Sequence, residues 1–159
     1  MWPNDRSSGR RGAGAAGAAD HGCLAAITMP ASTQYVPFAR LATAHLCGAV
    51  GLGVSRIADL RLVVDEACGQ FLRCPTAADL HVPLTLRFER KPELLRITVR
   101  GPVPPSWPDR RNLGWLVLQA LAGEVRHEVD PADGLGTLSF DEPLSADGVS
   151  GDVLWFATS

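Results

Sequence analysis

The chain has 159 residues, of which 46% are hydrophobic, and a formal net charge of −2 at pH 7. This length fits one domain with loose ends, and the apolar content is sufficient for a core. A near-neutral charge lacks the basic excess of proteins that bind nucleic acid or an anionic membrane surface. We therefore expect neither nucleic acid nor a membrane as a direct partner.

The composition of the two ends predicts how the domain is bounded. Residues 1–22 are rich in Gly, Ala, Ser and Arg, and we expect them to form a disordered extension. They lack the leucine-rich run of a signal peptide, and no stretch has the roughly 20 apolar residues of a membrane span. We expect a cytoplasmic protein with a single domain over residues 23–143 and a C-terminal tail over residues 144–159.

Four cysteines occur without a CxxC pair or zinc-site spacing: Cys23, Cys47, Cys68 and Cys74. In a reducing compartment we expect most of them to be buried as small apolar residues. The alternative is a redox role for Cys68 with Cys74 or Cys47.

The first half of the domain predicts one strand followed by two helices. Residues 23–31 form a short apolar run, which favours an edge strand, and residues 35–52 carry apolar residues at helical spacing, with Leu41 in the stripe. A second helix is expected from Ser55, as its N-cap, to about Arg73. The expected buried stripe of this second helix is Leu60, Val63, Val64, Ala67 and Phe71.

The second half predicts two hairpins with a helix between them. Residues 81–90 and 94–100 alternate in hydrophobicity and form the first hairpin. A Pro-rich loop follows at residues 101–112, and a third helix at residues 113–125. The second hairpin is formed by residues 126–129 and 135–143. This order predicts an α/β two-layer sandwich, with the helices on one face of a mainly antiparallel sheet.

Two polar residues of the second helix are candidates for chemistry. Glu66 and Gln70 lie one turn apart, so they share a helix face that is offset from the buried stripe. On spacing alone, a solvated flank is the simpler interpretation. The alternative is a pocket in which the carboxylate orients a water or hydroxyl and the amide oxygen holds a metal. Asp65 lies about 100° away around the helix, and we expect it on the plain surface.

Glycines near turns are the other candidates. Gly136 and Thr137 lie where a turn meets a strand, and Gly114 opens the third helix, where backbone N–H groups can meet a phosphate. Each position also fits an ordinary hairpin or helix start. The sequence contains no Walker, GxGxxG, HExxH or GxSxG motif, and its histidines have no metal-ligand spacing.

The order of elements and the segments ADLRLVVDEACGQFLR, LGWLVLQALAGEV and GLGTLSF resemble the anti-sigma factor branch of the GHKL ATPase and kinase superfamily. The similarity extends over residues 23–141 and is nearest to actinobacterial anti-sigma-F factors of the RsbW and UsfX type. It implies a Bergerat-type (histidine kinase-like ATPase) fold, frequently homodimeric. It also implies transcription regulation in a stress response, in which the protein keeps a sigma factor from RNA polymerase. ATP-competent members are serine/threonine kinases that phosphorylate an anti-anti-sigma (STAS) partner.

The resemblance assigns roles to residues of the second helix. Glu66 matches the glutamate that acts as the catalytic base. Gln70 stands where the family has the asparagine that holds magnesium, and its side chain is one methylene longer. Because Mg²⁺ demands octahedral geometry with ligands at roughly 2.0–2.1 Å, the metal role of Gln70 is doubtful.

The remaining nucleotide motifs match only in part. Arg100 and Gly101 stand where the family has an aspartate that accepts the adenine amino group, so a cation is expected in place of the acceptor. Gly114 is what remains of the Gly-rich lid, whereas Gly136 and Thr137 match the final Gly-Thr motif. We therefore expect ATP and Mg²⁺ binding to be weak or lost, because each missing buried polar contact is worth roughly 1–3 kcal/mol.

The resemblance also assigns a partner contact. FARL, residues 38–41, matches the opening of the family's first helix, where an exposed arginine contacts the partner, and that role falls to Arg40. The expected function is an anti-sigma factor that sequesters a sigma-F-like sigma factor and is countered by a competing anti-anti-sigma partner. The alternative is an active ATP-dependent serine/threonine kinase with Glu66 as its base.

Overall fold

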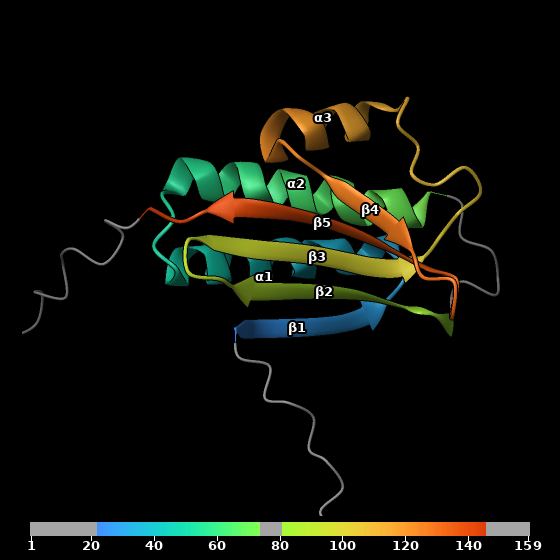
Figure 1. Ribbon diagram of the computed structural model, residues 1–159, viewed down its shortest axis with the longest axis horizontal. Coiled ribbons are helices and arrows are strands. Elements are labelled where there is room, and N and C mark those ends of the chain that lie inside the picture. The colour runs from blue at the N-terminus through green and yellow to red at the C-terminus, as the bar shows by residue number, and fades with distance from the viewer. Residues whose placement is uncertain (1–21, 74–80, 146–159) are drawn as a thin grey trace, which may run out of the picture.

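Five strands form one open antiparallel sheet in the order β1-β2-β3-β5-β4, which Figure 1 shows with its helices. The structure is a computed structural model that describes residues 22–73 and 81–145. The strands are β1 (Cys23–Pro30), β2 (Pro83–Arg90), β3 (Leu94–Pro102), β4 (Arg126–Val129) and β5 (Leu135–Pro143). The helices are η1 (Thr33–Tyr35), α1 (Val36–Ala49), α2 (Val54–Leu72) and α3 (Leu113–Ala122).

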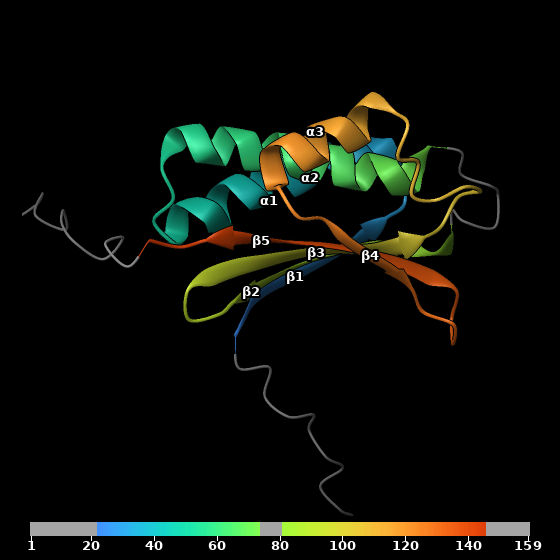
Figure 2. The ribbon, with the colours of Figure 1, turned by 45° about the horizontal axis from the view of Figure 1, so that its top comes forward.

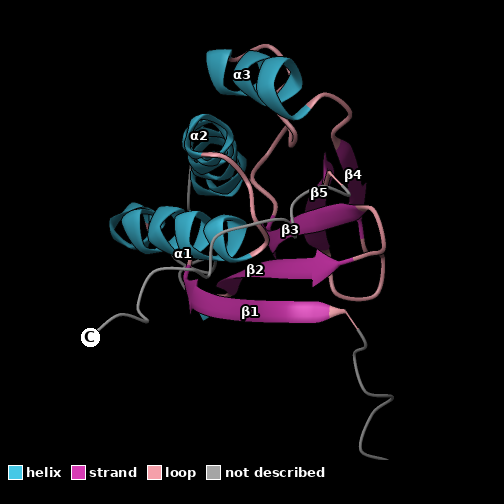
Figure 3. Ribbon diagram, turned by 90° about the vertical axis from the view of Figure 1, so that its left-hand side faces the viewer, coloured by secondary structure: helices cyan, strands magenta, loops and turns pink. Residues whose placement is uncertain are grey.

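Helices α1, α2 and α3 lie on the same face of the sheet, with α2 between the other two (Figures 2 and 3). The predicted layering of helices over an antiparallel sheet is therefore confirmed, and both predicted hairpins are present. The opposite face of the sheet carries no helix among the described residues. No helix within the described ranges is both long and apolar enough to cross a bilayer.

The core lies between α2 and the sheet. All five residues of the predicted α2 stripe are at most 2% exposed. Strand alternation directs a second set of apolar side chains toward them: Leu84, Leu86, Phe88, Leu95, Ile97, Val99, Leu138 and Phe140. The predicted N-cap of α2 was wrong, because Val54 is already helical and Gly53, in an extended conformation, precedes it without a side-chain cap.

Helix α1 packs on the core largely along its predicted stripe, with Leu41 as the exception. Its buried residues are Val36, Ala39, Thr43 and Cys47, spaced by three or four positions along one stripe. Leu41 lies outside this stripe and is 66% exposed, so its predicted burial was wrong. This exception leaves a large apolar residue of α1 on the surface.

One ion pair crosses the core where α2 begins. Arg56 on α2 donates to both carboxylate oxygens of Glu142 on β5, at 2.8 and 2.6 Å. Glu142 is 5% exposed, and a buried carboxylate needs such a bidentate partner. Nothing in the hydrophobic pattern indicated this pair, since Glu142 precedes Pro143 at the end of an otherwise apolar strand face.

The burial of two cysteines bears on the redox alternative. Burial, with a smaller contribution from the nearby Glu142 carboxylate, raises the pKa of the Cys47 thiol to about 12. Burial also raises the pKa of Cys68 to about 12, with a contribution from Asp65. Such thiols are poor nucleophiles, which argues against a thiol switch through Cys68. Cys74 and the apolar part of the C-terminal tail lie outside the described residues.

Candidate functional site

The Glu66 carboxylate lies against the first turn of α3. A Cβ atom added to Gly114 would overlap Glu66 Oε2 and would lie 2.8 Å from an Arg73 guanidinium nitrogen. Glycine at position 114 thus permits the close approach of α3 to two charged side chains of the C-terminal half of α2. The N-terminal end of a helix favours a nearby carboxylate electrostatically. The structure therefore brings the predicted residues Glu66 and Gln70, one turn apart on α2, to the start of α3.

Gln70 is 1% exposed, so the interpretation of a solvated flank was wrong for this residue, whereas Leu62 and Arg73 on the same helix face are exposed. Its Nε2 donates to Asn112 Oδ1 at 3.3 Å. The same Asn112 oxygen caps α3 by accepting from the Trp115 backbone N–H at 2.7 Å. Gln70 Oε1 is buried and has no hydrogen-bond partner among the described residues. The amide therefore ties α2 to the α3 cap through its nitrogen and leaves its oxygen unsatisfied.

Gly101 and Gly136 lie side by side on β3 and β5 and form the floor beneath the end of α2. A Cβ atom on Gly101 would lie 2.6 Å from Leu84 Cδ1 and 3.5 Å from the Phe71 ring. A Cβ atom on Gly136 would overlap Val103 and lie 2.8 Å from Trp107 Cη2. Both glycines are therefore covered by side chains of the protein itself.

Trp107, from the Pro-rich loop, fills the space over this floor. Its ring centroid lies 5.1 Å from that of Phe71 and 6.1 Å from that of His127. His127 in turn meets Trp115 edge-on at 5.9 Å, and the Arg110 guanidinium lies 5.7 Å from the centre of the Trp115 ring. We call Phe71, Trp107, Trp115 and His127 the aromatic cluster. It joins α2, the Pro-rich loop, β4 and α3, and such offset ring pairs are each worth about 0.5–1.5 kcal/mol beyond area burial.

The surroundings of His127 disfavour its charged form. Burial lowers the pKa of His127 below 6.5, and the neighbouring Arg110 cation lowers it further. An Arg110 guanidinium nitrogen lies 3.0 Å from His127 Nε2, and the guanidinium can only donate, so Nε2 accepts. Neutral histidine is the form that this contact requires.

Two residues expected at the site lie elsewhere. Thr137 follows the inward-facing Gly136 on β5, so it faces the open side of the sheet, where it lines a shallow pocket with Arg126, Glu128 and Ser139. The structure does not bring it to Gln70. Arg100 also lies on the open side, where it pairs with Asp130 at 3.2 Å and with Asp133. The expectation of a cation in the place of the adenine acceptor was wrong, because the inward position is Gly101, which has no side chain.

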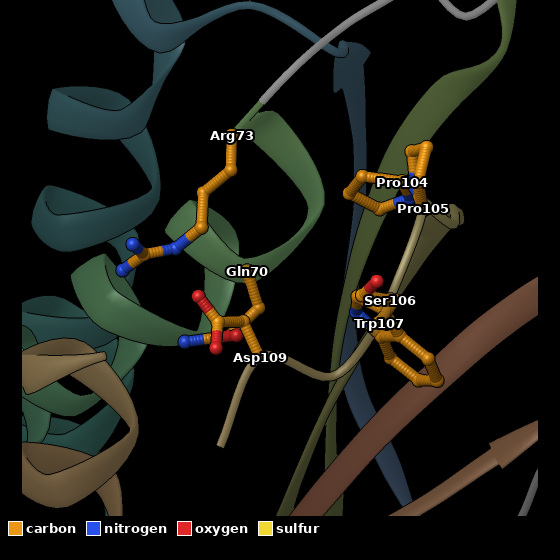
Figure 4. A pocket seen from close by; sticks show the side chains of 7 residues that line it. All are labelled: Gln70, Arg73, Pro104, Pro105, Ser106, Trp107 and Asp109. Carbon is orange, nitrogen blue, oxygen red and sulfur yellow. The ribbon is translucent and has the colours of Figure 1, made fainter. Parts of the chain in front are cut away.

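A pocket of about 180 Å³ remains beside Gln70 (Figure 4). Ligand pockets for drug-sized molecules measure roughly 300–1,000 Å³, so this one is too small for a nucleotide. The Gln70 amide nitrogen is engaged by Asn112, and the Gly136 floor is under Trp107. The residues present do not fit ATP with Mg²⁺. The described residues also hold no group of three His, Cys, Asp or Glu side chains suited to a metal ion.

Sequence reasoning missed two residues that shape this site. Asn112 directly precedes the apolar run of α3, which is the ordinary signal of an N-cap, and could have been identified. Trp107 is a large aromatic residue in a loop whose other residues are small, polar or proline. Its presence was visible, but its position over Gly136 depends on how the loop folds back.

The predicted partner residue Arg40 lies at a different surface, on the outer face of α1 and α2. It lines a groove of about 340 Å³ together with Ala58, Arg61, Leu62 and Asp65. Phe38 and Leu41 on α1 and Leu62 on α2 are 53%, 66% and 43% exposed. We call Arg40, Leu41, Ala58, Arg61, Leu62 and Asp65 the α1–α2 face. It combines arginines with exposed large apolar side chains.

Neither a scan against models of protein families nor a search of curated proteins finds a match for this chain. The assignment of function therefore rests on the geometry of the site near Gln70 and of the α1–α2 face.

Proposed function

We propose that this protein is an anti-sigma factor that sequesters a sigma-F-like sigma factor through the α1–α2 face. The single observation that carries the proposal is the groove that Arg40, Arg61 and the exposed Leu62 line, with the exposed Leu41 next to Arg40 on α1. Exposed apolar patches with a charged rim are typical of protein-binding sites, and aromatic residues and arginine are enriched in them. The proposal includes a Bergerat-type fold and a homodimer, which the resemblance implies.

The pairing of Arg40 supports its availability to a partner. Its guanidinium lies 4.0 Å from the Asp65 carboxylate, and the two side chains are 43% and 35% exposed. An exposed ion pair at this distance contributes about 0–1 kcal/mol, so exchanging Asp65 for a carboxylate of a partner costs little. The planar guanidinium and apolar stem of arginine suit it to anchor an interface.

A binding role without catalysis is supported by the filled site near Gln70. Trp107 covers Gly136 and Gln70 is engaged with the α3 cap, so the proposed mechanism is sequestration. A competing anti-anti-sigma partner of the STAS type releases the sigma factor when its binding site overlaps and its affinity is comparable.

The test measures sigma-factor affinity by calorimetric titration of the full chain. We expect Arg40→Ala to weaken binding by at least tenfold, which corresponds to about 1.4 kcal/mol. Arg90→Ala is the matched control, because Arg90 is exposed at the end of β2, and we expect no change. Equal affinities of the two variants would remove Arg40 from the interface. No binding by the unaltered protein would refute the anti-sigma function.

The rival function is an ATP-dependent serine/threonine kinase, and one observation favours it: the Glu66 carboxylate lies beside the first turn of α3. Incubation with labelled ATP, Mg²⁺ and the anti-anti-sigma partner distinguishes the two functions. We expect no phosphate on the partner. Transfer that is lost in Glu66→Ala would replace sequestration alone with kinase activity.

A further inference from the structure

The pocket beside Gln70 has mainly apolar walls and no net charge. Figure 4 shows its lining, which comes from the end of α2 on one side and from the Pro-rich loop on the other. Arg73 and Asp109 carry opposite charges. Hydrogen bonds from Asn112 and from the Arg111 backbone lower the pKa of the Asp109 carboxyl, and the Arg73 cation lowers it by a smaller amount. The lining residues are Gln70, Arg73, Pro104, Pro105, Ser106, Trp107 and Asp109. An ionic ligand would find no uncompensated counter-charge here.

Two buried polar atoms of residues that line this pocket, Gln70 Oε1 and Trp107 Nε1, have no hydrogen-bond partner among the described residues. Gln70 is 1% exposed, and its Oε1 has no hydrogen-bond donor among the described residues. Its orientation is fixed, because Nε2 donates to Asn112 Oδ1, which also caps α3. Figure 4 shows Gln70 on the α2 side of the pocket, across from Pro104, Pro105 and Trp107. A buried acceptor of this kind is unfavourable until a donor reaches it.

The size of the pocket sets the size of the ligand. An apolar cavity of about 150 Å³ is sufficient to hold benzene. The pocket here has about 180 Å³, which accommodates one or two fused rings and not a nucleotide. Proline and indole side chains present flat apolar surfaces, against which a planar ring packs well.

We propose that this pocket binds a small neutral aromatic molecule, of the size of phenol or indole, whose single N–H or O–H group donates to Gln70 Oε1. The ring lies between the Arg73 stem and the walls formed by Pro104, Pro105 and Trp107. This site is separate from the α1–α2 face. Binding of the aromatic molecule requires neither a sigma factor nor ATP, so a negative result in the test below would not affect the proposed function.

The test compares two isomers of equal volume by calorimetric titration of the full chain. 3-Methylindole keeps its N–H group, whereas 1-methylindole has lost it. We expect 3-methylindole to bind at least tenfold more tightly, because only this isomer satisfies the Gln70 oxygen. Equal affinities, or no binding of 3-methylindole at millimolar concentration, would overturn the proposal.

Variants place the effect at Gln70. Gln70→Met keeps the length of the side chain and removes the acceptor, so we expect both isomers to bind it equally. The Gln70→Met change also removes the hydrogen bond to Asn112, so a second variant is needed. Pro105→Gly removes an exposed wall of the pocket, and we expect it to lower the affinity for both isomers at least threefold. Leu41→Ala, on the α1–α2 face, is the control and should change neither affinity. Discrimination that persists in Gln70→Met, or unaltered binding to Pro105→Gly, would contradict the placement.

Discussion

Large apolar side chains are buried at the end of α2 near Gln70, whereas they are exposed on the outer face of α1. Near Gln70, Phe71 is 2% exposed and Trp107 lies over Gly136, so aromatic residues close the sandwich. On α1, Phe38 and Leu41 are 53% and 66% exposed, although a helix that packs on a sheet ordinarily buries such residues. Apolar area therefore stabilises the fold at one region, and under the proposed function it is available for association at the other.

The largest effect that tests this comparison comes from two matched truncations. Phe71→Ala should lower the free energy of unfolding by about 3–5 kcal/mol, since it removes a fully buried ring from the core and from its contact with Trp107. Phe38→Ala should change it by no more than about 0.5 kcal/mol, because that ring is exposed. Urea denaturation measures both. Similar losses of unfolding free energy in the two variants would mean that the two regions contribute equally to stability.

A smaller effect is expected from filling the floor of the site. Gly136→Val should destabilise the protein by about 1–3 kcal/mol, because the new side chain meets Val103 and Trp107. Gly69→Ala is the control, since a Cβ atom there has no neighbour within 4 Å. Alanine should stabilise α2 by up to about 1 kcal/mol relative to glycine. Thermal melting of both variants tests whether Trp107 rests on Gly136, and an unchanged melting temperature in Gly136→Val would argue against that contact.

The smallest effect concerns pH. The pKa of His127 is lowered by burial and by Arg110, so the unfolded chain takes up a proton near pH 6.5 before the folded protein does. Stability from neutral His127 is thus fully present above pH 6.5 and is lost as the pH falls through the lower folded pKa. His127→Asn should reduce the slope of stability against pH in this window, as measured by denaturation at several pH values. An unchanged slope in His127→Asn would show that His127 does not carry the effect.

Much of the fold could be predicted, because hydrophobic periodicity is a local property. The α2 stripe and the alternation of the first hairpin were identified from spacing alone, and the stripe lies in the core together with Leu84, Leu86, Phe88, Leu95, Ile97 and Val99. The position of Thr137 could also have been predicted. Neighbouring residues of a strand point to opposite faces, so Gly136 and Thr137 cannot both line one pocket. Matching them as one motif concealed this alternation.

Other features depended on packing between distant segments. Gln70 reaches Asn112 across 42 residues of sequence, and Arg56 reaches Glu142 across 86 residues. Neither partner carries a periodic signal, because polar residues at helix flanks and strand ends look alike whether they are solvated or paired. The exposure of Leu41 and the burial of Thr43 were equally hidden, since the two residues exchange the roles that their hydrophobicity suggests.

The sequence by itself determined which segments become helices and strands, and which faces of α2 and of the sheet turn inward, because the spacing of apolar residues sets these faces turn by turn. Only the tertiary structure decided that Trp107 covers Gly136, that the Gln70 oxygen is left without a donor, and that Arg40 borders an open groove. Each of these outcomes depends on how closely two separate segments approach, and that distance follows from the packing of the whole domain.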